Sequence, residues 1–455
     1  MKSPSNHDLS YFAPATRVID DWLNTIKSLR PNMNFAVGIH HSDGKYQRSV
    51  NNTHYRSMSG DDILNIGSIA KMLTATVILM LVQEGLLGLD DLVVDRLPWI
   101  QKHQDRKFRT VTIKQLLSHT SGLARDGCST DHWQLRQPFP DKNKLHESVL
   151  DSNLVTYDIN NMKYSNLAYG LLGEIAESAT GKSYQQLCKK YLTTPLSLAS
   201  TYTGNIPADN QSPVSPSYSR PMAGKSVELP FPTATNAFTP ASGWYTTLSD
   251  LAKITHALHN GKLVGDSLYQ EMIDSGPHHW IPPEHRQIQY GLGVLSYPTN
   301  LRNVYGHTGA FIGQKSACFH DKDSNITVCI ASTGNPNQID FLLDGIFDIL
   351  QFHEQHAQSP TPQDLERYNL VLNNLLSTKR IIATKNKIAS ISLDSEMPFV
   401  TEETLELIAD DTMIITNAHE LSSRGEKVLF NRDSSGEIST VKYAGMSMWP
   451  QKSVS

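Results

Sequence analysis

The sequence predicts an α+β protein in which an antiparallel sheet is flanked by helices and carries a helical insertion, followed by a small C-terminal all-β domain. Three observations support this prediction. Strand-like segments lie near both ends of residues 1–355, and the stretch between them has helical periodicity. After about residue 385 the chain becomes short alternating segments separated by turns. Strands from the two ends can therefore pair in one sheet, with helices packed on it.

The strands of the sheet are read from runs of apolar and β-branched residues. Two lie on either side of a turn at Ser42-Asp43-Gly44, and three more precede residue 333. The five predicted strands are residues 34–40, 46–50, 302–306, 314–320 and 326–332.

Two helices are expected to contribute most to the interior. Residues 68–85 are apolar nearly all round, which is typical of a buried helix. Residues 166–179 form an amphipathic pattern, and Gly181 is placed to close that helix.

A polar, proline-containing stretch at residues 353–363 reads as a linker. We therefore expect a first domain over residues 1–355, a linker over 356–365 and a β domain over 366–455.

Bulk composition restricts the partners of the protein. The chain has 455 residues, a net charge of -5 and a pI near 6.4, so nucleic acid and anionic membranes are not expected partners. No run approaches the roughly 20 apolar residues that cross a bilayer. The first thirty residues lack the apolar segment of a secretory signal, which favours a cytoplasmic location.

The cysteines are scattered along the chain, without a C-x-x-C pair. This distribution is typical of reduced, buried thiols, although Cys318 and Cys329 could face each other across a hairpin.

The first chemical motif is Ser68-Ile69-Ala70-Lys71 at the start of the predicted buried helix. Residues three apart share a helix face, so the Lys71 amine can reach the Ser68 hydroxyl. A lysine in a dry pocket has a lowered pKa and can take the proton of a serine nucleophile. The Ser68 N–H can face a developing oxyanion. Alone, the motif also fits an ordinary helix start with a surface lysine.

Tyr164-Ser165-Asn166 precedes the amphipathic helix. A tyrosine whose pKa is lowered by a nearby lysine can deliver a proton to a leaving group. Asn166 can donate to a substrate carbonyl and hold Lys71. A turn with a helix cap would explain the same residues.

A third motif, Gly306-His307-Thr308-Gly309-Ala310, is expected on an edge strand, where its glycines let a substrate lie against the backbone. The Ala310 N–H, at the end of the run His307, Thr308, Gly309 and Ala310, could be a second oxyanion donor. His307 alone also fits a structural histidine with a satisfied hydrogen bond.

The three motifs together resemble those of the serine β-lactamase and penicillin-binding protein superfamily. The Tyr-x-Asn form of the middle motif is similar to the class C branch. Further matching stretches are LLSHTSGL (116–123), YSNLAYGLLGEIAE (164–177), SGWYTTLSDLAKI (242–254) and YGLGV (290–294). The resemblance extends over roughly residues 20–350. It implies a β-lactamase/transpeptidase-like fold, with an acylated Ser68, Lys71 and Tyr164 as general base and acid, and Asn166 and His307 as substrate or network residues.

One position departs from the pattern of β-lactamases and D,D-peptidases, which usually carry lysine where this chain has His307. A neutral imidazole is a weaker anchor for a substrate carboxylate than an ammonium group. His-Thr-Gly is similar to esterase-like, D-aminopeptidase-like and LACTB-like relatives. Residues 428–445 (VLFNRDSSGEISTVKYAG) resemble the lipocalin-like domains appended to some of these hydrolases.

The sequence therefore predicts a serine hydrolase acting on ester or amide (peptide) bonds through a Ser68 acyl-enzyme. Three alternatives stay open: a β-lactamase or D,D-carboxypeptidase, an acyltransferase, and a non-catalytic scaffold. The expected partner is a small molecule or peptide, and the sequence leaves the oligomeric state undetermined. Acyl-enzyme hydrolysis needs no metal or cofactor, so none is expected. A zinc site is also not expected at His353 and His356, which are one residue short of the spacing that places two zinc ligands on one helix face.

Overall fold

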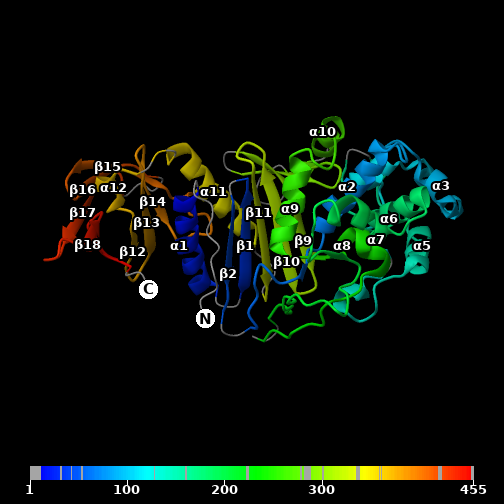
Figure 1. The fold of residues 1–455 in the computed structure, drawn as a ribbon, viewed down its shortest axis with the longest axis horizontal. Helices are drawn as coiled ribbons and strands as arrows, with labels where there is room; N and C mark the ends of the chain where they lie inside the picture. Colours follow the sequence, from blue (N-terminus) through cyan, green and yellow to red (C-terminus); the bar gives the residue numbers. More distant parts are fainter. Residues whose placement is uncertain are drawn as a thin grey trace. The chain divides into compact units, whose positions relative to one another are not determined.

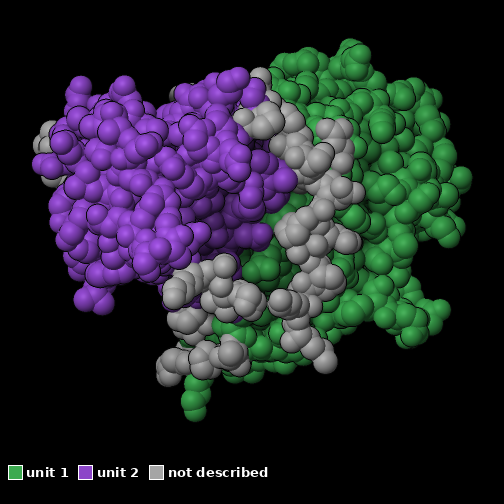
Figure 2. Space-filling view, turned by 60° about the vertical axis from the view of Figure 1, so that its left-hand side comes forward, with its two compact units in different colours: residues 1–6, 32–339 green, residues 7–31, 340–455 purple. Residues whose placement is uncertain are grey.

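The fold is taken from a computed structural model that describes residues 12–30, 33–42, 44–52, 55–127, 129–158, 161–221, 225–276, 279–280, 288–299, 302–334, 339–357, 359, 361–418 and 423–451. The chain divides into two compact units, coloured separately in Figure 2. One contains residues 32–339, and the other contains residues 7–31 and 340–455. The domain limits expected at residues 355 and 366 stay a prediction.

The first unit is built on an eight-stranded antiparallel sheet with the strand order β2-β1-β11-β10-β9-β8-β7-β6. The strands are β1 (Asn34–His41), β2 (Gly44–Val50), β6 (His279–Trp280), β7 (Ile288–Tyr290), β8 (Leu295–Pro298), β9 (Asn303–Phe311), β10 (Gln314–Asp321) and β11 (Ile326–Thr333). In the central pair, Val37 of β1 lies opposite Ile330 of β11. Segments from the two ends of this unit thus share one sheet, as the sequence predicted.

Helix α9 (Leu248–His259) covers one face of the sheet, where it contacts β1, β10 and β11 (Figure 1). Gly38 of β1 lies beneath this helix. A Cβ atom at Gly38 would be 3.4 Å from the Cβ of Leu248, an ordinary van der Waals distance.

The helical insertion lies between β2 and β6, as predicted. Its helices are α2 (Ile69–Gln83), α3 (Val93–Arg96), α4 (Ile113–Leu117), α5 (Lys142–Leu150), α6 (Asn166–Thr180), α7 (Tyr184–Cys188), α8 (Thr239–Ser242), α9 and α10 (Asp266–Asp274). Short helical turns are η1 (Pro98–Lys102), η2 (Arg106–Thr110), η3 (Asp131–Gln134), η4 (Lys189–Thr193) and η5 (Asn236–Phe238). A small second sheet has the order β3 (Leu64–Asn65), β5 (Trp244–Thr246), β4 (Tyr202–Thr203).

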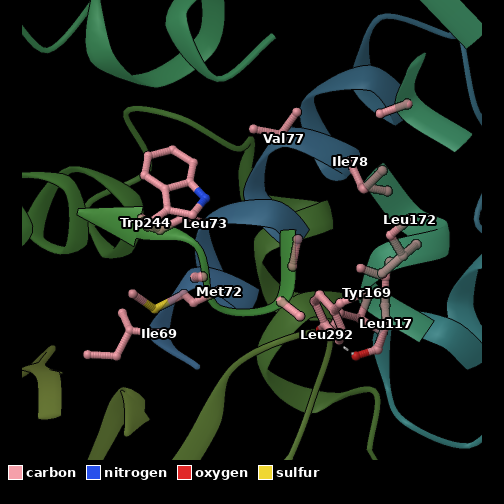
Figure 3. Close-up of a cluster of buried hydrophobic side chains, with 14 of the residues drawn as sticks. Ile69, Met72, Leu73, Val77, Ile78, Leu117, Tyr169, Leu172, Trp244 and Leu292 are labelled. Atoms are coloured by element: carbon pink, nitrogen blue, oxygen red, sulfur yellow. Dashed lines mark hydrogen bonds between the residues drawn. The ribbon is translucent and has the colours of Figure 1, made fainter. Parts of the chain in front are cut away.

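Helix α2 is the centre of the hydrophobic core. Its apolar side chains point in several directions, toward Trp244 on one side and toward Leu117, Tyr169 and Leu172 on another (Figure 3). The Tyr169 hydroxyl donates to the Leu117 carbonyl at 2.8 Å. Burial on all sides explains the absence of a polar face along α2 and confirms the predicted buried helix.

Helix α6 has the ends that the sequence predicted. The Ser165 hydroxyl accepts the backbone N–H of Ala168 at 3.1 Å, and Gly181 closes the helix with φ 67°. The left-handed conformation at a helix C-terminus suits glycine because it has no Cβ.

The second unit joins a pair of packed helices and one short helix to a barrel. Helix α1 (Ala13–Leu29) packs on α11 (Asp340–His356), and α12 (Gln363–Glu366) precedes the barrel. Gly345 makes room for Trp22, since a Cβ at this position would lie 2.2 Å from the indole. The Trp22 indole N–H donates to the Ser395 carbonyl at 2.9 Å.

Eight strands close the barrel in the order β12 to β19. They are β12 (Val371–Asn373), β13 (Thr378–Ala383), β14 (Ile388–Ser392), β15 (Glu403–Ala409), β16 (Thr412–Asn417), β17 (Lys427–Arg432), β18 (Ile438–Tyr443) and β19 (Met446–Pro450). Apolar side chains, including Ile381, Met413 and Val441, form its core. The predicted all-β C-terminal segment is confirmed.

Cys318 and Cys329 lie opposite each other on β10 and β11, and both are buried free thiols, as is Cys188. Cys128 lies outside the described residues. Among the helices of the described ranges, none combines the length and apolarity that crossing a membrane requires.

Candidate active site

Ser68 and Lys71 meet at the N-terminus of α2. Ser68 directly precedes the helix in a helical conformation, and the Lys71 Nζ lies 3.1 Å from the Ser68 Oγ. Lys71 is completely buried, whereas Ser68 keeps partial exposure. The spacing of three residues thus produces the predicted contact between a buried amine and an accessible hydroxyl.

The surroundings of Lys71 favour its neutral form. Its Nζ donates to the carbonyl oxygen of Ala241, at the end of α8, at 2.8 Å. Burial lowers the pKa of Lys71 well below its ordinary value, against the opposing charge of Asp126, while Arg125 adds to the lowering. An uncharged amine has a lone pair that can accept the Ser68 proton, as the sequence led us to expect.

Tyr164 reaches the same pair from the start of α6. The Lys71 Nζ lies 4.7 Å from the centre of the Tyr164 ring. Burial raises the pKa of Tyr164, and a hydrogen bond with Ser68 offsets only part of this rise. The direction is opposite to the predicted lowering, because burial disfavours the phenolate more than the hydrogen bond with Ser68 and the charge of Arg125 favour it. A neutral phenol is a proton donor.

Asn166 is engaged with a residue that the sequence analysis did not single out. Its Nδ2 donates to the Asp126 carboxylate at 2.6 Å. Its Oδ1 is buried and has no hydrogen-bond partner within the described ranges. Asp126 is almost fully buried and pairs with Arg125 at 3.3 Å. The signal in the sequence that could have identified Asp126 was its position shortly after the stretch LLSHTSGL.

The strand β9 passes directly beside the start of α2. A Cβ at Gly67 would lie 2.6 Å from the backbone nitrogen of Ala310, and one at Gly309 would lie 1.9 Å from the Ile66 carbonyl oxygen. Strand β8 pairs with β9 only over Asn303–Gly306, so the next residues of β9 have a free edge in the described structure. The predicted edge strand is wrong, because β9 is an inner strand that lies between β10 and β8. Only its residues beyond Gly306 lack a partner in β8, and among them Ala310 lies beside Gly67, the residue before Ser68.

His307 points into the protein rather than along the free edge. It is 2% exposed, and its Nδ1 donates to the Thr308 carbonyl at 2.5 Å. Its Nε2 accepts from the Tyr290 hydroxyl at 3.1 Å. Burial lowers the pKa of His307 to about 3, so the imidazole is uncharged near neutral pH. Thr308 is half-buried on the same strand.

The geometry described above agrees with the family comparison. The family model named Beta-lactamase matches residues 36–350 of the chain. The chain belongs to this Beta-lactamase family. Penicillin-binding protein 4 from Amycolatopsis lactamdurans is 34% identical over 152 residues, which is 32% of this chain and 38% of that protein. Protein flp from Staphylococcus aureus (strain MW2) is 33% identical over 136 residues, 30% of this chain and 27% of that protein. The matched regions thus span well under half of these relatives.

Solved structures share the fold. The D-stereospecific amidohydrolase from Streptomyces sp. has a TM-score of 0.59 at 23% identity and covers 71% of this chain and 94% of its own. The D-amino acid amidase from Ochrobactrum anthropi SV3 has a TM-score of 0.63 at 19% identity, over 76% of this chain and all of its own. The octameric penicillin-binding protein homologue from Pyrococcus abyssi has a TM-score of 0.63 at 18% identity, over 96% of this chain and all of its own.

Proposed function

We propose that this member of the Beta-lactamase family is a serine hydrolase that opens ester or amide bonds through an acyl-enzyme on Ser68. The observation that carries the proposal is the 3.1 Å separation between the Ser68 hydroxyl and a buried Lys71 amine whose charged form is disfavoured. A hydroxyl in water is a poor nucleophile, and an adjacent uncharged amine removes that limitation.

In the proposed first half-reaction, the Ser68 Oγ attacks the substrate carbonyl as Lys71 accepts the hydroxyl proton. The leaving group departs with a proton that Tyr164 delivers. The Tyr164 phenol is hydrogen-bonded to Ser68. The proton on Lys71 replaces the one that Tyr164 gives up. Water then attacks the carbonyl carbon of the acyl-enzyme and gives its proton to Tyr164 or Lys71. The Ser68 oxygen departs and takes up a proton, which restores the hydroxyl.

The N–H groups of Ser68 and Ala310 are proposed to stabilise the oxyanion. Gly67 and Gly309 support this role, because each lacks the Cβ that would separate β9 from the start of α2. Two backbone donors fixed before reaction stabilise developing charge without reorganisation.

The third motif favours substrates that need no cationic anchor for a carboxylate. His307 is buried and uncharged near neutral pH, so it supplies no fixed positive charge on β9. This property ranks esters and amides above β-lactams and D,D-peptides, which carry a carboxylate. The names of two structural neighbours, a D-stereospecific amidohydrolase and a D-amino acid amidase, suggest amino acid amides as first test substrates.

The test is covalent labelling by a fluorophosphonate together with turnover assays. Wild type is expected to label, Ser68→Ala is expected not to label, and Ser267→Ala is the matched control at an exposed serine of α10. Equal labelling of Ser68→Ala and wild type would refute the proposal. Turnover of short p-nitrophenyl esters, D- and L-amino acid anilides and nitrocefin ranks the substrate classes. Nitrocefin turnover faster than that of every ester and anilide would place β-lactams above esters and amides and so reverse the expected ranking.

A further inference from the structure

His119, which follows α4, makes three separate contacts with the three residues centred on Tyr164. Its carbonyl oxygen accepts the backbone N–H of Lys163 at 2.7 Å. Its Nδ1 accepts the backbone N–H of Ser165 at 3.2 Å. Its ring lies 4.3 Å, centre to centre, from the ring of Tyr164. One residue therefore fixes the backbone on both sides of Tyr164 and also contacts its phenol ring.

The imidazole of His119 is held in one chemical form. Because its Nδ1 accepts from a backbone N–H, the proton of the neutral ring is on Nε2. Burial lowers the pKa of His119 well below its ordinary value. A protonated ring would lose the Nδ1 acceptor and release Ser165. Burial, which favours the neutral ring, therefore also favours the contact between Nδ1 and the Tyr164 segment.

The surroundings of His119 hold it firmly. The side chain is completely buried, and its ring lies 5.1 Å from the Tyr169 ring and 4.9 Å from the Tyr290 ring. Its backbone has φ 60°, a left-handed conformation that is unfavourable for most residues with a side chain. Such a conformation persists where several contacts determine it together, as they do around His119.

We infer that His119 is a positioning residue for Tyr164. His119 holds the phenol of Tyr164 against Ser68, so that the phenol proton reaches the leaving group. This inference rests on the proposed function, because it needs Tyr164 to act as the proton donor. In this proposal His119 acts through Tyr164 and takes no proton itself. The contacts to Lys163 and Ser165 fix the backbone, and the ring contact fixes the phenol.

The leaving group of the substrate separates this role from a purely structural one. A p-nitrophenolate departs without a proton, whereas an alkoxide or amide nitrogen needs one. We therefore compare a p-nitrophenyl ester with an ethyl ester of the same acid. The measured quantity is kcat/KM, which covers the steps up to acylation and excludes the deacylation that both substrates share.

The variants are His119→Leu, which removes both the acceptor and the ring, and His119→Asn, which keeps a short acceptor and tolerates φ 60°. His119→Leu is expected to lose at least about tenfold more kcat/KM on the ethyl ester than on the p-nitrophenyl ester. His119→Asn should lose less, and so serves if His119→Leu does not fold. Tyr164→Phe should show the same leaving-group selectivity, and adding His119→Asn to Tyr164→Phe should cause no further loss on the ethyl ester.

Two results would overturn the inference while leaving the proposed function intact. One is an equal loss on both esters for His119→Asn in an otherwise active enzyme. The other is an additive loss in the double variant, which would show that His119 acts independently of Tyr164. By contrast, a wild type that is neither labelled by a fluorophosphonate nor active on either ester would refute the proposed function itself.

Discussion

The amide nitrogen of Asn166 donates to the carboxylate of Asp126 at 2.6 Å, so the asparagine of the second motif is tied to a buried acid. The negative charge of Asp126 also acts on Lys71, whose pKa it raises against the larger lowering by burial. Asp126 thus connects two of the three motifs. It accepts a hydrogen bond from Asn166 of the second motif and interacts electrostatically with Lys71 of the first.

Replacing Asp126 with asparagine should shift the pH dependence of catalysis. Asp126→Asn keeps an oxygen that can accept from Asn166 and removes the charge that raises the Lys71 pKa. The proposed reaction needs the neutral amine, so the acid limb of the kcat/KM profile should move to lower pH. Asp131→Asn, at an exposed position of η3, is the control and should leave that limb in place. A shift of the Asp126→Asn limb toward higher pH would contradict this prediction.

Removing the Lys71 amine should abolish catalysis while preserving the fold. Lys71→Met removes the proton acceptor, so kcat/KM should fall by at least about a hundredfold. The methionine side chain is of similar length and fills the buried space, so no loss of thermal stability is expected. The exposed Lys102→Met is the matched control and should keep full activity. A melting temperature more than about 5 °C below wild type would show that Lys71 also supports the fold.

The stability of Lys71→Met relative to wild type should depend on pH. Because the folded-state pKa of Lys71 is lowered, the unfolded chain binds a proton that the folded chain releases, which destabilises the wild type below the unfolded pKa of about 10.4. The advantage of Lys71→Met should therefore be larger at neutral pH than near pH 10 and shrink as the pH approaches 10. Urea unfolding midpoints at several pH values measure this difference, and an advantage that grows with pH would contradict the sign.

His320 on β10 should contribute to the loss of stability in acid. Its ring lies 5.5 Å from the ring of His256 and 5.3 Å from that of His259. Burial lowers the pKa of His320 to about 3, and the neighbouring His256 makes a smaller contribution in the same direction. The unfolded histidine has a pKa near 6.5, so unfolding takes up a proton and stability falls as the pH drops below about 6.5. His320→Asn should weaken this dependence in urea unfolding between pH 7.5 and 4.5, whereas an unchanged slope would exclude His320 as a contributor.

The close approach between β9 and α2 should not tolerate a methyl group at Gly309. The Cβ of Gly309→Ala would meet the Ile66 carbonyl oxygen at 1.9 Å. We expect a loss of about 1–3 kcal/mol in the free energy of unfolding and slower fluorophosphonate labelling. Gly38→Ala, also on a strand of the sheet, has its nearest neighbour at 3.4 Å and is the matched control. Equal effects of the two substitutions would show that the approach of β9 to α2 is not limiting.

Local parts of this protein could be predicted from the order of its residues alone. The pairing of Ser68 with Lys71 follows from a spacing of three on a helix, and the bounds of α6 follow from Ser165 and Gly181. Runs of apolar and β-branched residues predicted five strands of the sheet, β1, β2, β9, β10 and β11. Their positions at both ends of the first unit predicted one shared sheet. These features depend on contacts between near neighbours or on repeating patterns, both of which can be read along the chain.

Folding determines which distant residues reach Ser68 and what charge they carry there. Asp126 and His119 come from a loop whose sequence has no catalytic pattern, and they meet Asn166 and Tyr164 only after folding. The direction of the Tyr164 pKa shift and the inward orientation of His307 follow from burial, which depends on all surrounding elements at once. Spacing along a chain does not encode solvent exclusion, so the electrostatics of the site had to come from the packed molecule.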